Sequence, residues 1–173
     1  MQTLHSYGLP TLAAVALAFG LAGLASSSFA ADTAAPALAP APPTSGLSST
    51  ANYKEVDLKK LVSDSRTEVP GQRIIFAPSP VKFRATLAAR PAPQKADYLM
   101  SALSMMKVSN PPLVSQRIGL DYGGDKALAA YIEDGVAARL SKDVLPGQAR
   151  TFYAFHVYNH SRGPALLVTS FSD

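Results

Sequence analysis

The apolar and polar side chains of this chain follow two different periods. They alternate one by one in Val81–Leu87 and Leu113–Tyr122, the period of a half-buried strand. In Val56–Val62 and Ala96–Val108 the apolar residues instead recur at helical spacing. Pro111 and Pro112 end the second helix because proline lacks the N–H that a helix needs. The mixture of periods predicts an α+β fold.

A further strand is predicted just before the first alternating stretch. Arg73–Ala77 is rich in β-branched and aromatic residues. Pro78 and Pro80 separate it from Val81–Leu87, and proline within a strand usually marks a bulge or an edge. We therefore expect a bend or bulge here and not one smooth strand.

The C-terminal end has the pattern of a hairpin. Thr151–Tyr158 and Ala165–Phe171 are dense in aromatic, β-branched and other apolar residues. Turn-forming residues separate them, which predicts the loop Asn159–Pro164.

The segment Lys126–Lys142 has two interpretations. Its apolar residues fit one long amphipathic helix, which would follow the turn at Gly123 and Gly124. They also fit a strand over Lys126–Ile132 followed by a helix over Glu133–Val144. Gly135 costs a continuous helix about 1 kcal/mol relative to alanine, which favours the split.

The first thirty residues resemble an export signal. Thr11–Leu24 is an uncharged apolar run, too short to span a bilayer, and Ser28 and Ala30 suit a signal peptidase. We predict a signal peptide over residues 1–30, although its start carries no Lys or Arg; an anchor or a core helix is the alternative. A periplasmic location, or else secretion, follows. No second run approaches spanning length, so no transmembrane segment is expected in the mature chain.

The segment that follows differs in composition from the rest of the chain. Ala31–Asn52 is an Ala/Pro/Ser/Thr stretch without an apolar face, which predicts a disordered linker. The folded domain is expected over residues 53–173.

Composition narrows the chemistry further. The chain has no cysteine, which excludes disulfides, thiolate metal sites and a thiol nucleophile. Its formal net charge of +4 favours contact with anionic surfaces. The basic residues form no polybasic run, so no nucleic acid is expected as a partner.

His156, Tyr158 and His160 are the candidate chemical group. Strand alternation places His156 and Tyr158 on one face, with His160 in the loop. The two imidazoles would lie about 13 Å apart, too far to share a metal ion. We expect an aromatic strand with a partly buried histidine, and neither a metal nor a cofactor.

The predicted order of elements resembles a known family. Pro-Gly-Gln precedes a strand at both Pro70–Gln72 and Pro146–Gln148, and a helix separates the third strand from the fourth. Over Tyr53–Phe171 this order is similar to small exported bacterial OB-fold domains, with Ala96–Val108 as an added helix. The resemblance implies a five-stranded OB-like barrel; the alternative is an open antiparallel sheet packed with two to three helices.

The resemblance also implies where a ligand would bind. OB-folds use the loops between strands one and two and between strands four and five. Asn159, His160 and Arg162 offer donors in the second loop, with His156 and Tyr158 on the adjoining strand. We expect a non-catalytic binding or accessory module of the bacterial envelope, whose partner is an envelope protein or an anionic envelope component.

Two other functions remain open on sequence alone. One is an assembly protein that pairs through a sheet edge, and the other is a hydrolase or metal enzyme that uses His156 or His160. The oligomeric state is not indicated.

Overall fold

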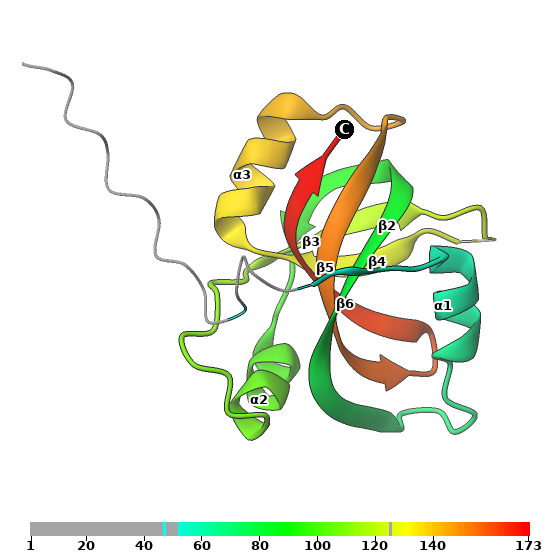
Figure 1. Ribbon diagram of the computed structural model, residues 1–173, viewed down its shortest axis with the longest axis vertical. Helices are drawn as coiled ribbons and strands as arrows, with labels where there is room; N and C mark the ends of the chain where they lie inside the picture. Colours follow the sequence, from blue (N-terminus) through cyan, green and yellow to red (C-terminus); the bar gives the residue numbers. More distant parts are fainter. Residues whose placement is uncertain (1–46, 48–51, 125) are drawn as a thin grey trace, which may run out of the picture. The chain divides into compact units, whose positions relative to one another are not determined.

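The computed structural model describes Leu47, residues 52–124 and residues 126–173 (Figure 1). Within these residues the protein has three helices and a six-stranded mixed sheet, which is an α+β fold. The expected signal peptide, residues 1–30, lies outside the described residues. So does the expected linker Ala31–Asn52, apart from Leu47 and Asn52.

The helices and strands follow the predicted order, with one short strand added at the start. That strand is too brief to leave a pattern in the sequence. The elements are β1 (Lys54–Glu55), α1 (Leu58–Asp64), β2 (Arg73–Pro93), α2 (Asp97–Met105), β3 (Gln116–Asp121), β4 (Leu128–Ile132), α3 (Asp134–Asp143), β5 (Ala149–His160) and β6 (Gly163–Ser172). The separate β4 and α3 confirm the split of Lys126–Lys142 that Gly135 favoured.

Strand β2 runs through both predicted strands of this region and beyond them. A register shift between Ile75 and Ser79 confirms the expected bulge. The strand was predicted to end at Leu87, but its pairing with β3 continues to Pro93. Two further register shifts interrupt that pairing, and proline is tolerated where a ladder is irregular.

The C-terminal hairpin is tighter than the sequence predicted. Asn159 pairs with Pro164, and His160 pairs with Gly163, so only Ser161 and Arg162 form the turn. The loop prediction Asn159–Pro164 was therefore wrong in its bounds. Asn, Gly and Pro are common in turns, but here the two strands pair up to the last residues before the turn.

The sheet is partly ring-like. Its strand order is β1-β2-β3-β4-β6-β5, and an additional pairing joins β2 to β5. Strands β1 and β2, and likewise β4 and β6, pair in parallel. The alternative of an antiparallel sheet is wrong because these parallel pairs are present.

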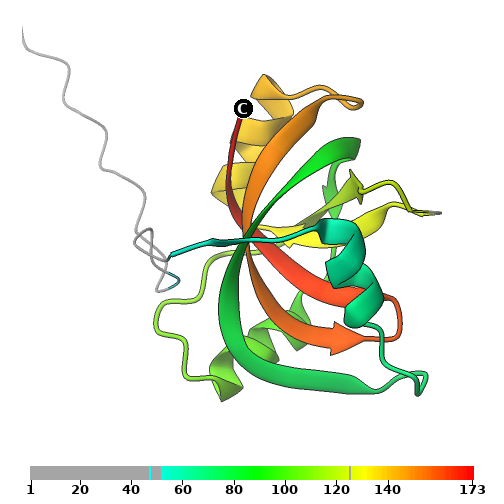
Figure 2. The same cartoon turned by 45° about the vertical axis from the view of Figure 1, so that its right-hand side comes forward.

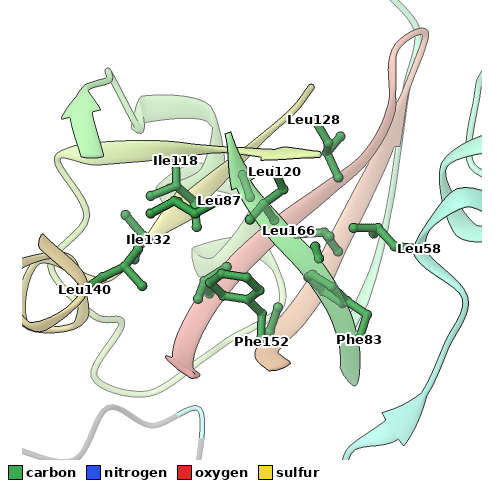
Figure 3. Close-up of a cluster of buried hydrophobic side chains, with 14 of the residues drawn as sticks. Leu58, Phe83, Leu87, Ile118, Leu120, Leu128, Ile132, Leu140, Phe152 and Leu166 are labelled. Atoms are coloured by element: carbon green, nitrogen blue, oxygen red, sulfur yellow. The ribbon is translucent and has the colours of Figure 1, made fainter. Parts of the chain in front are cut away.

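The main core cluster lies on the face of the sheet that the ring encloses. Every strand of the ring contributes to it, and α1 and α3 add Leu58 and Leu140. Figure 3 shows these side chains converging, with Phe83 and Phe152 close together; the two ring centroids lie 6.1 Å apart. Burial of so many aliphatic and aromatic side chains is the main source of stability.

A second core cluster joins α2 to β5 and β6. Leu99 and Leu103 of α2 pack in it with Phe155, Val157 and Leu167. Leu47 also belongs to this cluster and is only 8% exposed. The folded unit thus includes a residue from the segment that was predicted to be a linker.

Candidate functional site

A cleft of about 920 Å³ opens beside the β5–β6 turn. In both views the β3–β4 and β5–β6 hairpins diverge on the side of the molecule where α1 lies (Figures 1 and 2). Residues of both hairpins line the cleft, together with Arg66 after α1 and Gln72 and Arg73 at the start of β2. Segments distant in the sequence therefore contribute to one hollow.

The cleft is strongly basic, and we call it the basic cleft. Five exposed cationic side chains line it, each from a different segment, and no Asp or Glu occurs among its described lining residues. The five are Arg66, Arg73, Arg117, Lys126 and Arg162. The ion pairs formed within residues 52–124 and 126–173 join Lys60 to Asp64, Lys82 to Glu55 and Arg150 to Asp173, and none includes these five. Their charge therefore remains available to an anion.

Three tyrosines meet at the edge of the basic cleft. The hydroxyls of Tyr131 and Tyr158 are hydrogen bonded at 3.3 Å, and Tyr98 packs edge-on against Tyr158 with 5.0 Å between ring centroids. The guanidinium of Arg73 stacks 3.9 Å above the ring of Tyr98. Burial, and then the hydrogen bond to Tyr131, raises the pKa of Tyr158. Tyr158 therefore remains a neutral phenol at physiological pH.

His160, the last residue of β5, has a defined tautomer beside the cleft. The backbone N–H of Arg162 donates to Nδ1 of His160 at 3.1 Å. Burial lowers the pKa of His160, and the charges of Arg162 and Arg73 lower it further. Because Nδ1 accepts, the neutral ring carries its proton on Nε2. His160 thus offers one N–H donor and no charge.

His156 lies apart from the basic cleft and has its own partners. Its Nε2 donates to Oδ1 of Asn159 at 2.6 Å, and its ring packs edge-on against Phe76 at 4.7 Å between centroids. Burial lowers the pKa of His156, and the hydrogen bond to Asn159 offsets part of that effect. The ring is almost fully buried, so these contacts are those of a packed side chain.

The predicted site residues therefore separate into two groups. Tyr158, His160 and Arg162 line the basic cleft, whereas His156 and Asn159 do not. The expectation that His156 and Tyr158 share a face was wrong. A register shift between them interrupts the alternation of β5, and Tyr158 packs in the second core cluster with Phe155 and Val157.

Four of the five cations were not among the site residues predicted from the sequence. Arg66, Arg73, Arg117 and Lys126 are isolated in the sequence, and only the sheet topology brings them together. For Arg66, Arg73 and Lys126 the usable signal was a position at or near the end of a predicted element. Arg117 lies in the middle of the predicted strand Leu113–Tyr122 and gave no such signal. Among the residues that the structure describes, no three His, Asp or Glu side chains gather as metal ligands would.

Comparison of this chain with protein-family models, with curated proteins and with solved structures gives no significant match. None of the helices described here has the length and apolar character needed to cross a bilayer.

Proposed function

We propose that the ring of strands is an OB-like barrel. Counted from β2, the pairings run first, second, third, fifth, fourth and back to first, with α3 between the third and the fourth. An OB-fold is a five-stranded, partly open barrel whose ligands contact strands two and three and the adjoining loops. The basic cleft includes Arg117 and Tyr131 from the second and third strands, which supports the same assignment.

On this scaffold the protein is a non-catalytic binding module that holds an anionic ligand in the basic cleft. The observation that carries the proposal is the convergence on one hollow of five cations from five segments, none of which forms an ion pair with another described residue. Nearby like charges repel one another, so such a cluster is costly to the free protein and favourable to a bound anion. The neutral donor of His160 adds a hydrogen bond without further repulsion.

The location of this module remains the one that the leader predicts. Export to the periplasm, with cleavage after Ala30, would give the cleft access to anionic envelope components and to acidic envelope proteins. Expression of the full chain in a Gram-negative host is expected to yield a periplasmic product that begins at Ala31. Mass spectrometry of the purified product checks this; material that begins at Met1 in the cytosolic fraction would refute export.

Charge reversal tests the binding function directly. Arg117→Glu with Arg162→Glu alters two exposed cations of the cleft, and we expect the doubly substituted protein to leave a heparin column at much lower salt than wild type. The matched control reverses Arg90 and Lys107, which are also exposed but do not line the cleft. An equal shift for both variants would show that only net charge matters and would exclude the cleft.

A further inference from the structure

One edge of β4 is incompletely paired where it borders the basic cleft. Strand β4 pairs with β3 along its whole length, from Leu128 to Ile132. Its pairing with β6 on the other side is limited to Tyr131 with Leu167 and Ile132 with Val168. The two parallel strands therefore separate toward Leu128, and the cleft lies along this separation.

The backbone of Ala129 is directed toward that opening. The N–H of Glu133 donates to the carbonyl of Val168 in β6 at 3.1 Å. Along a strand, alternate residues direct their N–H and C=O groups to the same side. Tyr131 and Ala129 therefore direct these groups toward β6, and at Ala129 that strand is no longer paired. Ala129 is exposed and lines the cleft.

The side chains around this edge leave it accessible to another backbone. Ala127 and Ala129 are exposed and line this part of the cleft, and a methyl group covers little of the main chain beside it. An unpaired edge with accessible N–H and C=O groups is a template for an added strand.

We propose that the basic cleft takes an extended, acidic peptide segment of a partner protein, which adds as a strand to the edge of β4 at Ala129. The inference rests on the proposed function, because the five cations select the acidic sequence. The open edge selects a peptide over another polyanion, because a peptide repeats N–H and C=O groups at the spacing of β4. Carboxylates that project from the added strand pair with Arg117 and Arg162 at the borders of the cleft.

The experiment uses the mature wild-type protein and two probes of identical charge. One is a short fluorescein-labelled peptide in which glutamate and threonine alternate, and the other is the same peptide with its central amides N-methylated. N-methylation removes the donors of strand pairing and leaves every carboxylate. We expect about tenfold weaker binding of the methylated peptide by fluorescence anisotropy. Equal affinities would overturn the inference.

A variant of the protein tests the same contact from the other side. Ala129→Pro removes the N–H that faces the cleft and leaves all five cations in place. We expect about tenfold loss of affinity for the unmethylated peptide by fluorescence anisotropy; an unchanged affinity in a folded variant would contradict strand addition at Ala129. Circular dichroism establishes that the variant is folded; if it is not, the peptide comparison on wild type decides.

The outcomes separate this inference from the proposed function. If heparin release depends on Arg117 and Arg162 but both peptides bind equally, the cleft binds anions and strand addition is wrong. If heparin release is independent of the cleft, the proposed function fails as well. A single-stranded oligonucleotide or a sulfated glycan that outcompetes the peptide at equal charge would overturn the choice of a peptide.

Discussion

At the level of single residues, the turn that carries Arg162 depends on the glycine that follows it. Gly163 has a φ of +122°, which side chains other than hydrogen rarely permit. A Cβ at this position would lie 3.2 Å from Cγ1 of Val62 in α1. Gly163 therefore allows the β5–β6 turn to pack closely on α1, beside the basic cleft.

Substitution of this glycine is expected to destabilise the fold. Gly163→Ala should lower the free energy of unfolding by about 1–3 kcal/mol, because it adds both backbone strain and a close contact. The control is Gly135→Ala in α3, where nothing lies within 4 Å of the added Cβ. That change should stabilise the protein by about 0.5–1 kcal/mol. Urea denaturation measures both, and a neutral or stabilising effect at Gly163 would contradict the structure.

The lowered pKa values of His156 and His160 make the stability of the fold depend on pH. Burial lowers the pKa of both His156 and His160 from the ordinary value of 6.5. Below that value the unfolded chain binds protons that the folded chain does not, so the free energy of unfolding falls as the pH falls from 6.5 toward the folded-state pKa values. His156→Gln should make this decline shallower. Urea denaturation at several pH values gives the slope of the free energy of unfolding against pH. A slope that is the same in the variant and in wild type would show that His156 does not cause the decline.

At the level of elements, α1 is short and relies on its N-cap. Oδ1 of Asp57 accepts a hydrogen bond from the backbone N–H of Lys60 at 3.0 Å. This bond satisfies one of the amides that a helix leaves unpaired at its start. Since only Ser65 separates Arg66 from the end of α1, the cap also helps to position one cation of the basic cleft.

Removal of this cap should cost a measurable part of the stability. Asp57→Ala is expected to lower the free energy of unfolding by about 1 kcal/mol. Asp57→Ser should keep most of the stability that the cap contributes, because serine caps helices equally well. Thermal unfolding followed by circular dichroism compares the two variants. Equal losses for alanine and serine would mean that the carboxylate acts through its charge and not as a cap.

Most elements could be predicted from sequence because their periods are local. The alternation in Val81–Leu87 and the helical spacing in Ala96–Val108 depend only on which side each residue faces. The continuation of β2 to Pro93 could not be predicted, since it depends on pairing with β3, which is distant in sequence. The same reason explains why Asn159 and His160 belong to β5 and not to a loop.

At the level of the whole molecule, the basic cleft is a product of topology. Arg162 was identified from its loop, but Arg66 and Arg117 are isolated residues whose proximity follows only from the order of strands in the sheet. The register shift in β5 likewise places Tyr158 on a different face from His156. The sequence predicted one shared face because strict alternation assumes a regular strand. Sequence patterns thus predicted which residues are polar and exposed, but not which of them meet.

The folded unit includes a residue that lies before the predicted start of the domain at Tyr53. Leu47 precedes the first strand, yet it is buried in the second core cluster with Leu99 and Phe155. Leu47→Ala should therefore lower the free energy of unfolding by about 2–3 kcal/mol, the cost of losing a buried leucine side chain. Val69 is 57% exposed, so Val69→Ala should change stability by no more than about 0.5 kcal/mol. Urea denaturation of both variants measures the difference. If they are equally stable, the domain begins at Tyr53 and the segment before it contributes nothing to the core.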